Sequence, residues 1–159
     1  MLIKYLIVFF VSMVPLIELR GAIPIAVGMD LNLVTSYILA VVGNMLPVPI
    51  IYFFARKVLI WGCDKKYIGK FFTFCIEKGE RGGQKLTHAA GRKGLFVALM
   101  LFVGIPLPGT GAWSGALIAA LLNMRIKHAF FAIVLGVILA GVLVTLISSG
   151  ALAALKFLI

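Results

Sequence analysis

Two long stretches of the chain contain only uncharged residues, most of them apolar. Leu33 to Ala55 and Ala129 to Leu155 have 23 and 27 residues. At 1.5 Å rise per residue, helices of these lengths reach about 35 and 40 Å, and the hydrocarbon core of a bilayer is roughly 30 Å thick. The pattern therefore predicts two transmembrane helices.

Two further apolar regions are interrupted near their middles. Polar residues, prolines and glycines break the first between Pro15 and Pro24 and the second between Gly104 and Gly111. The arms before the breaks, Lys4 to Pro15 and Gly94 to Pro106, reach roughly 18 Å as helices, which is about as deep as the bilayer midplane. We therefore expect two re-entrant hairpins. The alternative, six short crossings, requires spans of under half the usual length.

These elements predict an all-α integral membrane protein with two inverted repeats. Each repeat is a re-entrant helical hairpin followed by one transmembrane helix, and a basic amphipathic cytoplasmic loop joins them. The single membrane domain, 1–159, then divides into repeat 1 (1–55), a cytoplasmic linker (56–93) and repeat 2 (94–159). Because each repeat crosses the membrane once, the second is inverted about a pseudo-two-fold axis in the membrane plane.

Composition and charge strengthen this interpretation. The chain is 63% hydrophobic, against the 45 to 50% typical of soluble domains, which excludes soluble enzyme folds.

The net charge is +10, and ten of the fifteen Lys and Arg residues lie between Arg56 and Lys93. Such a block favours a loop facing anionic lipid, with no nucleic acid as partner. In the two-repeat model twelve basic residues lie on this face and two on the other, so we expect the loop in the cytoplasm of a prokaryote and both termini outside its inner membrane.

Part of the loop has the periodicity of an amphipathic helix. Its apolar positions follow one helical face, which favours a helix on the cytoplasmic leaflet, ending at Gly79 and followed by a flexible break at Gly82-Gly83. A solvated helix docked on the protein is the alternative. Cys63 and Cys75 are expected to be free thiols in a reducing compartment. The apolar face comprises Ile68, Phe71, Phe72, Cys75 and Ile76.

Candidate functional residues gather where the two breaks are expected to meet. Glu18 and Arg20 are the one pair of opposite charges at this depth, where each costs roughly 2.5 to 3.5 kcal/mol even on a lenient insertion scale. They indicate either a functional site or a structural salt bridge that pins the hairpin. Asn44 is the midpoint of its predicted span and is expected to face the same site, or else to bond a neighbouring helix.

The second hairpin contributes the start of a half-helix. Pro106 and Pro108 form its turn, and Thr110, Trp113 and Ser114 follow, where exposed amide groups favour an anion. The spacing of Gly111 and Gly115 is typical of close helix packing, and Gly136 with Ala140 could form the seam of a homodimer. No nucleotide-binding loop, metal cluster or catalytic triad is present in the sequence, so we expect neither an enzyme nor a cofactor.

Both breaks carry residues that resemble a known family. The segments Glu18-Leu-Arg20-Gly-Ala-Ile-Pro24 and Gly104-Ile-Pro106-Leu-Pro108-Gly-Thr-Gly-Ala-Trp113-Ser-Gly resemble the small multidrug export proteins of bacteria and archaea, over nearly the whole chain. That family is in turn similar to the DedA, or SNARE-associated, superfamily. The corresponding positions are Gly43-Asn44, Tyr52, Arg56, Phe102 and Pro106.

The resemblance implies opposed re-entrant hairpins and, for DedA relatives, transport of polyprenyl phosphates or phospholipids. The arginines of the superfamily's second hairpin are missing, since Val103 and Thr110 to Ala112 occupy that neighbourhood, and Asn44 replaces the usual aspartate. A phosphate site of this kind would rely on Arg20 alone.

Three functions follow as hypotheses. The first is a secondary transporter or lipid translocase for an amphipathic anion such as a polyprenyl phosphate, with a membrane lipid or amphipathic small molecule as its partner and protons as the coupling ion. Arg20 and Thr110 would hold the phosphate, and Glu18 would compete for Arg20. The second is a multidrug exporter that exchanges lipophilic cations for protons at Glu18, with cation-π contacts from Trp113 and Phe102. The third is a membrane scaffold without transport.

Overall fold

The computed structural model describes residues 2–15, 17–64, 69–107 and 109–158. Most of the described residues are helical and none forms a β-strand, as expected for the predicted all-α class. Their helices are α1 (Leu2–Met13), α2 (Glu18–Gly28), α3 (Leu33–Met45), α4 (Pro47–Cys63), α5 (Gly69–Gly104), α6 (Ala112–Leu121) and α7 (Ile126–Leu158).

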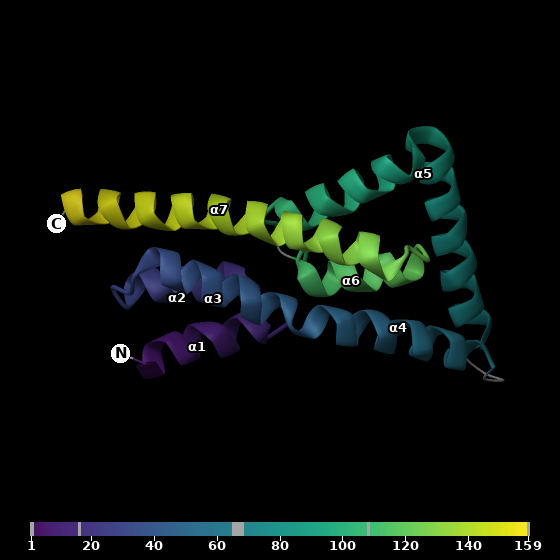
Figure 1. Cartoon of the computed structure of the whole chain (residues 1–159), viewed down its shortest axis with the longest axis horizontal. Helices are drawn as coiled ribbons and strands as arrows, with labels where there is room; N and C mark the ends of the chain where they lie inside the picture. The colour runs from purple at the N-terminus through teal and green to yellow at the C-terminus, as the bar shows by residue number, and fades with distance from the viewer. Residues whose placement is uncertain (1, 16, 65–68, 108, 159) are drawn as a thin grey trace.

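The helices form a bundle with two helical hairpins that point toward each other. Helix α1 runs from one end of the bundle to its middle and α2 returns, while the second half of α5 and α6 do the same from the other end (Figure 1). Helix α1 begins and α7 ends at the first end, whereas α4 ends and α5 begins at the opposite end (Figure 1). The breaks of the two hairpins therefore meet near the middle of the molecule.

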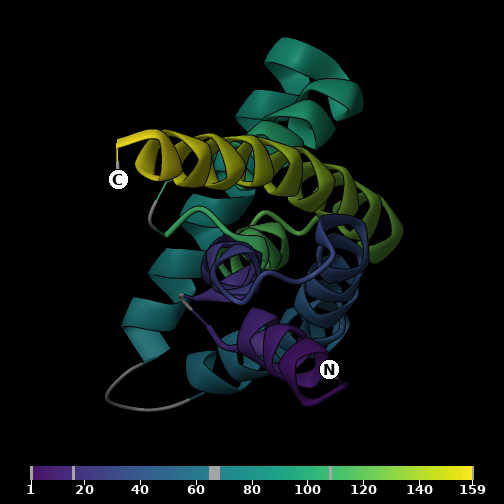
Figure 2. The same ribbon diagram turned by 90° about the vertical axis from the view of Figure 1, so that its left-hand side faces the viewer.

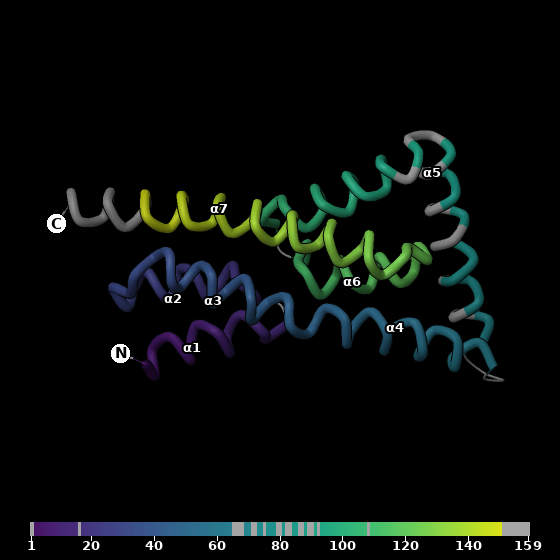
Figure 3. Tube along the Cα trace, viewed as in Figure 1, coloured from purple at the N-terminus to yellow at the C-terminus, as the bar shows by residue number. Residues whose placement is uncertain are grey.

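Two helical segments are long and apolar enough to cross a membrane. They comprise Leu33–Cys63, which joins α3 and α4, and Ile126–Gly150 of α7. Leu46, between α3 and α4, has helical dihedral angles, and Pro47 follows it at the start of α4. Because proline lacks an N–H group, the ladder of backbone hydrogen bonds is interrupted there while the chain keeps its direction (Figure 3). The first span thus extends eight residues beyond the predicted end at Ala55.

The two halves repeat the same local structure. Each second arm ends in a turn with a residue at positive φ, Asp30 at 54° and Asn123 at 53°, 93 positions apart. Asp and Asn tolerate this conformation better than most residues. Leu31 N donates to Ala26 O and Met124 N donates to Ala119 O, which is the same bond 93 positions on.

Equivalent glycines also pack each long helix against the first arm of its own hairpin. A Cβ atom at Gly43 would collide with the carbonyl oxygen of Phe9, and one at Gly136 would collide with that of Met100. Gly43 and Gly136 are again 93 positions apart. The Gly136 face of α7 is thus buried against α5, together with the fully buried Ala140. The prediction of a dimer seam at these two residues is wrong, because the chain itself covers them.

Helix α5 differs from the predicted loop helix. It continues through Gly79 and Gly82-Gly83, and its non-helical residue is Gly91, at φ 68° and ψ 179°. A glycine inside a helix costs only about 1 kcal/mol relative to alanine, so the earlier glycines weaken the helix without ending it. The left-handed φ at Gly91 is what reverses the chain into the second hairpin. Cys63 is a free thiol, as expected, whereas the Cys75 side chain lies outside the described part.

The outer surface of the bundle is largely apolar. Phe54 on α4, Phe131 on α7 and Ile3 on α1 are each more than 60% exposed, and similar side chains cover the other outer faces. An apolar surface of this extent marks contact with lipid or with another protein. Small and branched side chains fill the interior, where α2 and α6 each contact the long helix of the opposite half.

Candidate functional site at the meeting of the two breaks

Glu18 reaches from the first hairpin to the second. Its side chain is buried, with 4% of the residue exposed, and its Oε1 atom accepts a hydrogen bond from the backbone N–H of Trp113 at 3.2 Å. Trp113 is the second residue of α6, where backbone N–H groups have no partner within the helix. Glu18 thus places its carboxylate at the N-terminus of a helix from the opposite half.

The local conformation of Glu18 supports this reach. Its φ angle is 52°, in the left-handed region that non-glycine residues seldom adopt. A Cβ atom at Gly111 would occupy the position of the Glu18 carboxylate, so only glycine leaves the carboxylate enough room. Gly111 is therefore a site of close packing, as interpreted from the sequence, with the Glu18 side chain as its neighbour, and Gly115 packs closely against Val103. A glycine immediately before a helix was the available signal for this contact.

Arg20 binds the carbonyl groups of the second break. Its Nη2 atom donates to Val103 O at 3.3 Å, to Ile105 O at 3.2 Å, and to the carbonyl and hydroxyl oxygens of Thr110, the latter at 3.0 Å. Its Nη1 atom donates to Leu107 O. These carbonyl groups lie where α5 ends and the chain turns, so they lack helical partners. The guanidinium group supplies donors that water cannot supply inside a bilayer.

Glu18 and Arg20 therefore have separate partners. Among the described residues no ion pair joins them, and the ion pair found there is the exposed Arg81–Glu77 pair on α5, at 3.5 Å. The carboxylate binds a backbone donor and the guanidinium binds backbone acceptors, all from the second hairpin. The two charges bind groups across the breaks, which differs from the structural alternative of a salt bridge within one hairpin.

The electrostatics of this meeting point favour negative charge. Helices α2 and α6 both have their N-termini at the middle of the bundle, and viewed along the bundle α6 lies behind α2 (Figures 1 and 2). Each N-terminus carries roughly half a positive charge from the aligned peptide dipoles. Arg20 adds a full positive charge close by. The Glu18 carboxylate is thus a negative charge in a site where the N-termini of α2 and α6 and the Arg20 guanidinium each contribute positive potential.

The other predicted residues of the second hairpin have mixed roles. The Thr110 hydroxyl lies 2.7 Å from Ile105 O and 2.9 Å from Leu107 O, so it joins the Arg20 network. The Ser114 hydroxyl accepts from Gly111 N at 2.9 Å and donates to Gly111 O at 3.1 Å, which caps α6. Ser114 is therefore engaged by its own helix.

The described side chains of Trp113 and Pro106 lie outside this hydrogen-bond network. The indole Nε1 of Trp113 is buried without a partner, although the backbone of Trp113 binds Glu18. Pro106 is half-buried in the turn, and Pro108 lies outside the described residues.

Asn44 is fully buried in α3, and neither atom of its carboxamide has a hydrogen-bond partner. The buried hydroxyl of Ser36, two turns earlier on α3, is also unpartnered, and sequence reasoning did not single it out. An unsatisfied buried polar group costs about 1 to 3 kcal/mol, so these two residues require an explanation.

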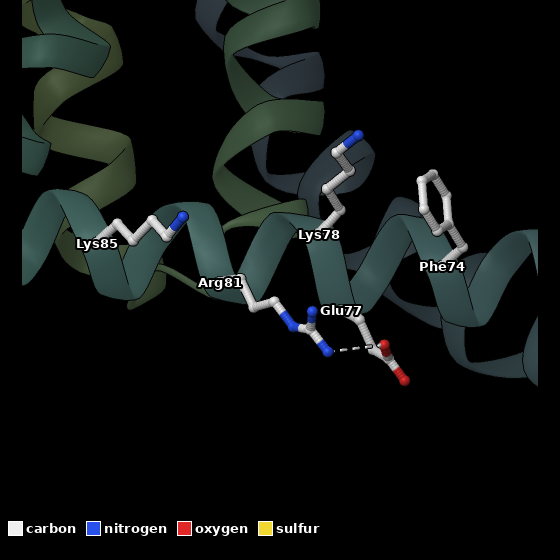
Figure 4. A pocket seen from close by; sticks show the side chains of 5 residues that line it. All are labelled: Phe74, Glu77, Lys78, Arg81 and Lys85. Atoms are coloured by element: carbon white, nitrogen blue, oxygen red, sulfur yellow. Dashed lines mark hydrogen bonds and ion pairs between the residues drawn. The ribbon is translucent and has the colours of Figure 1, made fainter.

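A second polar feature lies on the exposed face of α5. Phe74, Glu77, Lys78, Arg81 and Lys85 line a surface pocket there (Figure 4). Lys78 Nζ lies 5.0 Å from the centre of the Phe74 ring, a cation-π distance. This face contains part of the basic charge predicted for the loop, and it is distant in the chain from both breaks.

One family model matches the part of the chain that contains the site. Residues 18–143 match the model of the family described as "Putative small multi-drug export protein", which is more than three quarters of the chain. The chain belongs to this family. The match begins at Glu18 and includes Arg20, the second break and most of α7, so the small multi-drug export family covers both sides of the site.

The family description indicates a role in membrane transport, consistent with the two apolar spans. No curated protein and no solved structure matches the chain. The expected link to the DedA superfamily stays a prediction.

Proposed function

We propose that the protein is a secondary transporter of the cytoplasmic membrane that moves an amphipathic anion, with a polyprenyl phosphate as the model substrate. One observation carries the proposal: a buried carboxylate occupies a site between two helix N-termini and beside an arginine. Helix N-termini bind phosphate and carboxylate groups, and in membrane transporters half-helix N-termini point at anionic substrate groups. Glu18 then acts as a tethered anion that a substrate replaces.

Replacement requires Glu18 to lose its charge. When the carboxylate binds a proton, its attraction to the α6 N-terminus and to Arg20 falls, and the acid form needs a different hydrogen-bond pattern. The anionic head of the substrate then binds the Trp113 amide, and Arg20 exchanges carbonyl partners for phosphate oxygens. Arginine suits this exchange because its planar fork matches phosphate geometry. Proton binding and substrate binding are thereby coupled at one carboxylate.

The proposal includes the inverted-repeat topology. Each hairpin enters from one side of the membrane, the 56–93 segment lies in the cytoplasm, and both termini lie outside. Opening of either half exposes the meeting point of the breaks to one side, while the apolar chain of the substrate stays in lipid. The apolar outer surface and the opposed directions of the hairpins support this arrangement.

The test measures lipid flipping in proteoliposomes. The probe is phosphatidate carrying a fluorescent NBD group, and externally added dithionite quenches the label as it reaches the outer leaflet. The parent protein should flip labelled phosphatidate faster than labelled phosphatidylcholine, and acidification should change the rate.

Three variants make the test specific. Glu18→Gln keeps a hydrogen-bond acceptor for Trp113 and loses proton binding, so its flipping should become slow and independent of pH. Arg20→Lys keeps the charge but loses the fork, so flipping of phosphatidate should fall strongly. Arg81→Gln, on the exposed face of α5, is the matched control and should resemble the parent. Equal flipping of both lipids by the parent would contradict an anion transporter.

The family description and the burial of Glu18 favour a second candidate, export of lipophilic cations in exchange for protons. A cation site depends on the carboxylate and tolerates a changed arginine. In cells that accumulate ethidium, Glu18→Gln should then abolish export and Arg20→Lys should retain it. Indifference of both assays to both variants, with the proteins folded, would favour a scaffold.

A further inference from the structure

The two halves of the bundle have different polar interiors. Within the described residues, the buried polar side chains belong to the first half: Ser12, Glu18, Ser36 and Asn44. The shared register of the turns and glycines places Ala129 opposite Ser36 and Val137 opposite Asn44, each 93 positions later. Ala129 is 1% exposed and Val137 is fully buried, so the equivalent positions are equally enclosed and apolar.

This comparison shows that the fold does not require polar groups at these positions. Alanine and valine fill the equivalent sites of α7 within the same helix and turn structure. Ser12 and Glu18 have hydrogen-bond partners, at Phe9 O and Trp113 N. Ser36 and Asn44 have none, and both amide atoms of Asn44 are unpaired. Polar groups without a structural role and without a partner indicate a second state in which they are bonded.

Their placement on α3 defines a path. Ser36, Ala40 and Asn44 are spaced by four residues, so they lie on one face of the helix, and the small Ala40 separates them. Eight residues of helix place Ser36 and Asn44 about 12 Å apart. Asn44 adjoins Gly43, which contacts the end of α1 at the first break, while Ser36 lies toward the α2–α3 turn. The face therefore leads from the meeting point of the breaks toward the end of the bundle where the termini lie.

We infer that this face of α3 is the polar track along which the head group of the substrate leaves or enters the site on that side. The inference rests on the proposed transport function and adds the route. The Ser36 hydroxyl and the Asn44 carboxamide each donate hydrogen bonds, which fits the oxygen atoms of a phosphate or carboxylate head group and its hydrating water. The equivalent face of α7 carries no such groups and keeps the second half closed to water at this depth.

The first experiment measures access of water to the track and needs no knowledge of the substrate. Single cysteines are introduced by Ser36→Cys, Asn44→Cys, Ala129→Cys or Val137→Cys, in a background with Cys63→Ser and Cys75→Ser. A small water-soluble methanethiosulfonate reagent reacts with the thiolate, which forms where water reaches the sulfur atom. Native membranes are used so that the full chain is tested.

The expected result is asymmetric labelling. Cysteines at the two α3 positions should react at least about tenfold faster than those at the two α7 positions, because the thiolate forms far more readily in a hydrated site. Equal rates in the two helices, or no reaction at the α3 positions, would overturn the track. The α7 variants are matched controls because they have the same depth and burial.

The second experiment separates the track from the transport function. Asn44→Val and Ser36→Ala introduce the residues found at the equivalent positions of α7, and neither should lower the melting temperature. Asn44→Val should slow phosphatidate flipping, whereas Thr145→Val, which removes a partnered hydroxyl on α7, should not. If the parent protein flips no phosphatidate while the cysteine variants are labelled asymmetrically, the proposed function is refuted and the track is kept. If the Asn44→Val variant flips phosphatidate at the rate of the parent, the track is refuted as the route of the substrate.

Discussion

Gly111→Ala tests whether the Glu18 carboxylate holds the halves together. The added methyl group would occupy the position of that carboxylate, so Glu18 must withdraw from the N-terminus of α6. Withdrawal breaks the 3.2 Å bond to Trp113 N and leaves a buried charge without its donor. A hydrogen bond to a charged group contributes about 1.5 to 3 kcal/mol, and the exchange of glycine for alanine before a helix adds a smaller loss.

The assay is thermal unfolding in detergent, followed by a dye that reacts with exposed thiols. For a chain of this length a loss of 1 kcal/mol lowers the melting temperature by roughly 2 to 4 °C, so Gly111→Ala should lower it by about 3 to 12 °C. Gly28→Ala is the matched control, because a Cβ atom there meets no other atom within 4 Å. It should have little effect.

A double-mutant cycle isolates the contact. In a Glu18→Ala background the methyl group at 111 meets no carboxylate, so Gly111→Ala should then cost only the loss expected for a helix cap, about 1 kcal/mol or less. If Gly111→Ala lowers the melting temperature equally in both backgrounds, the carboxylate does not stabilise the meeting of the breaks. The description of Glu18 as a tethered anion would then be wrong.

Three further predictions follow from other features. Gly136→Ala should lower stability by about 1 to 3 kcal/mol in thermal unfolding, because its methyl group would meet the carbonyl oxygen of Met100; an unchanged melting temperature would contradict the close contact of α7 with α5. Gly91→Ala should cost about 1 to 2 kcal/mol through its left-handed φ and should speed proteolysis between the halves of α5, and equal cleavage rates would show that the turn lies elsewhere. In intact cells Cys63 should react with a membrane-permeant maleimide and not with an impermeant one. Labelling by the impermeant reagent would contradict a cytoplasmic location of the 56–93 segment.

The coarse architecture was predictable because it depends on apolar run length and on helix breakers. The absence of charge from Leu33 to Ala55 specified one span, and Pro15 and Gly104 placed both breaks near the middle of the bundle. The end of the loop helix was not predictable. The sequence does not distinguish Gly91 from Gly79, Gly82 and Gly83 as a helix breaker. Only the tertiary structure determines which of these glycines adopts a positive φ.

The hydrogen-bond partners of Glu18 and Arg20 also could not be predicted from the sequence. Two opposite charges separated by one residue suggest mutual pairing. Nothing in the sequence places around Arg20 the carbonyl groups that bind it, those of Val103, Ile105, Leu107 and Thr110. Those acceptors belong to the backbone, which has the same chemistry at every position. Ser36 was missed for a related reason, since a serine in an apolar helix usually bonds the carbonyl group one turn earlier and carries no distinctive signal.

The unequal length of the two breaks has a consequence for how such a protein can be assembled. Seven residues separate α5 from α6, against four between α1 and α2, and the surplus carbonyl groups of the longer turn are the ones that Arg20 binds. Two copies of the first half would bring two Glu18 carboxylates together at one point and leave two arginines without their acceptors. The halves are therefore complementary parts rather than interchangeable ones. Produced as separate polypeptides split in the 65–68 segment, they should associate as a heterodimer and not as either homodimer.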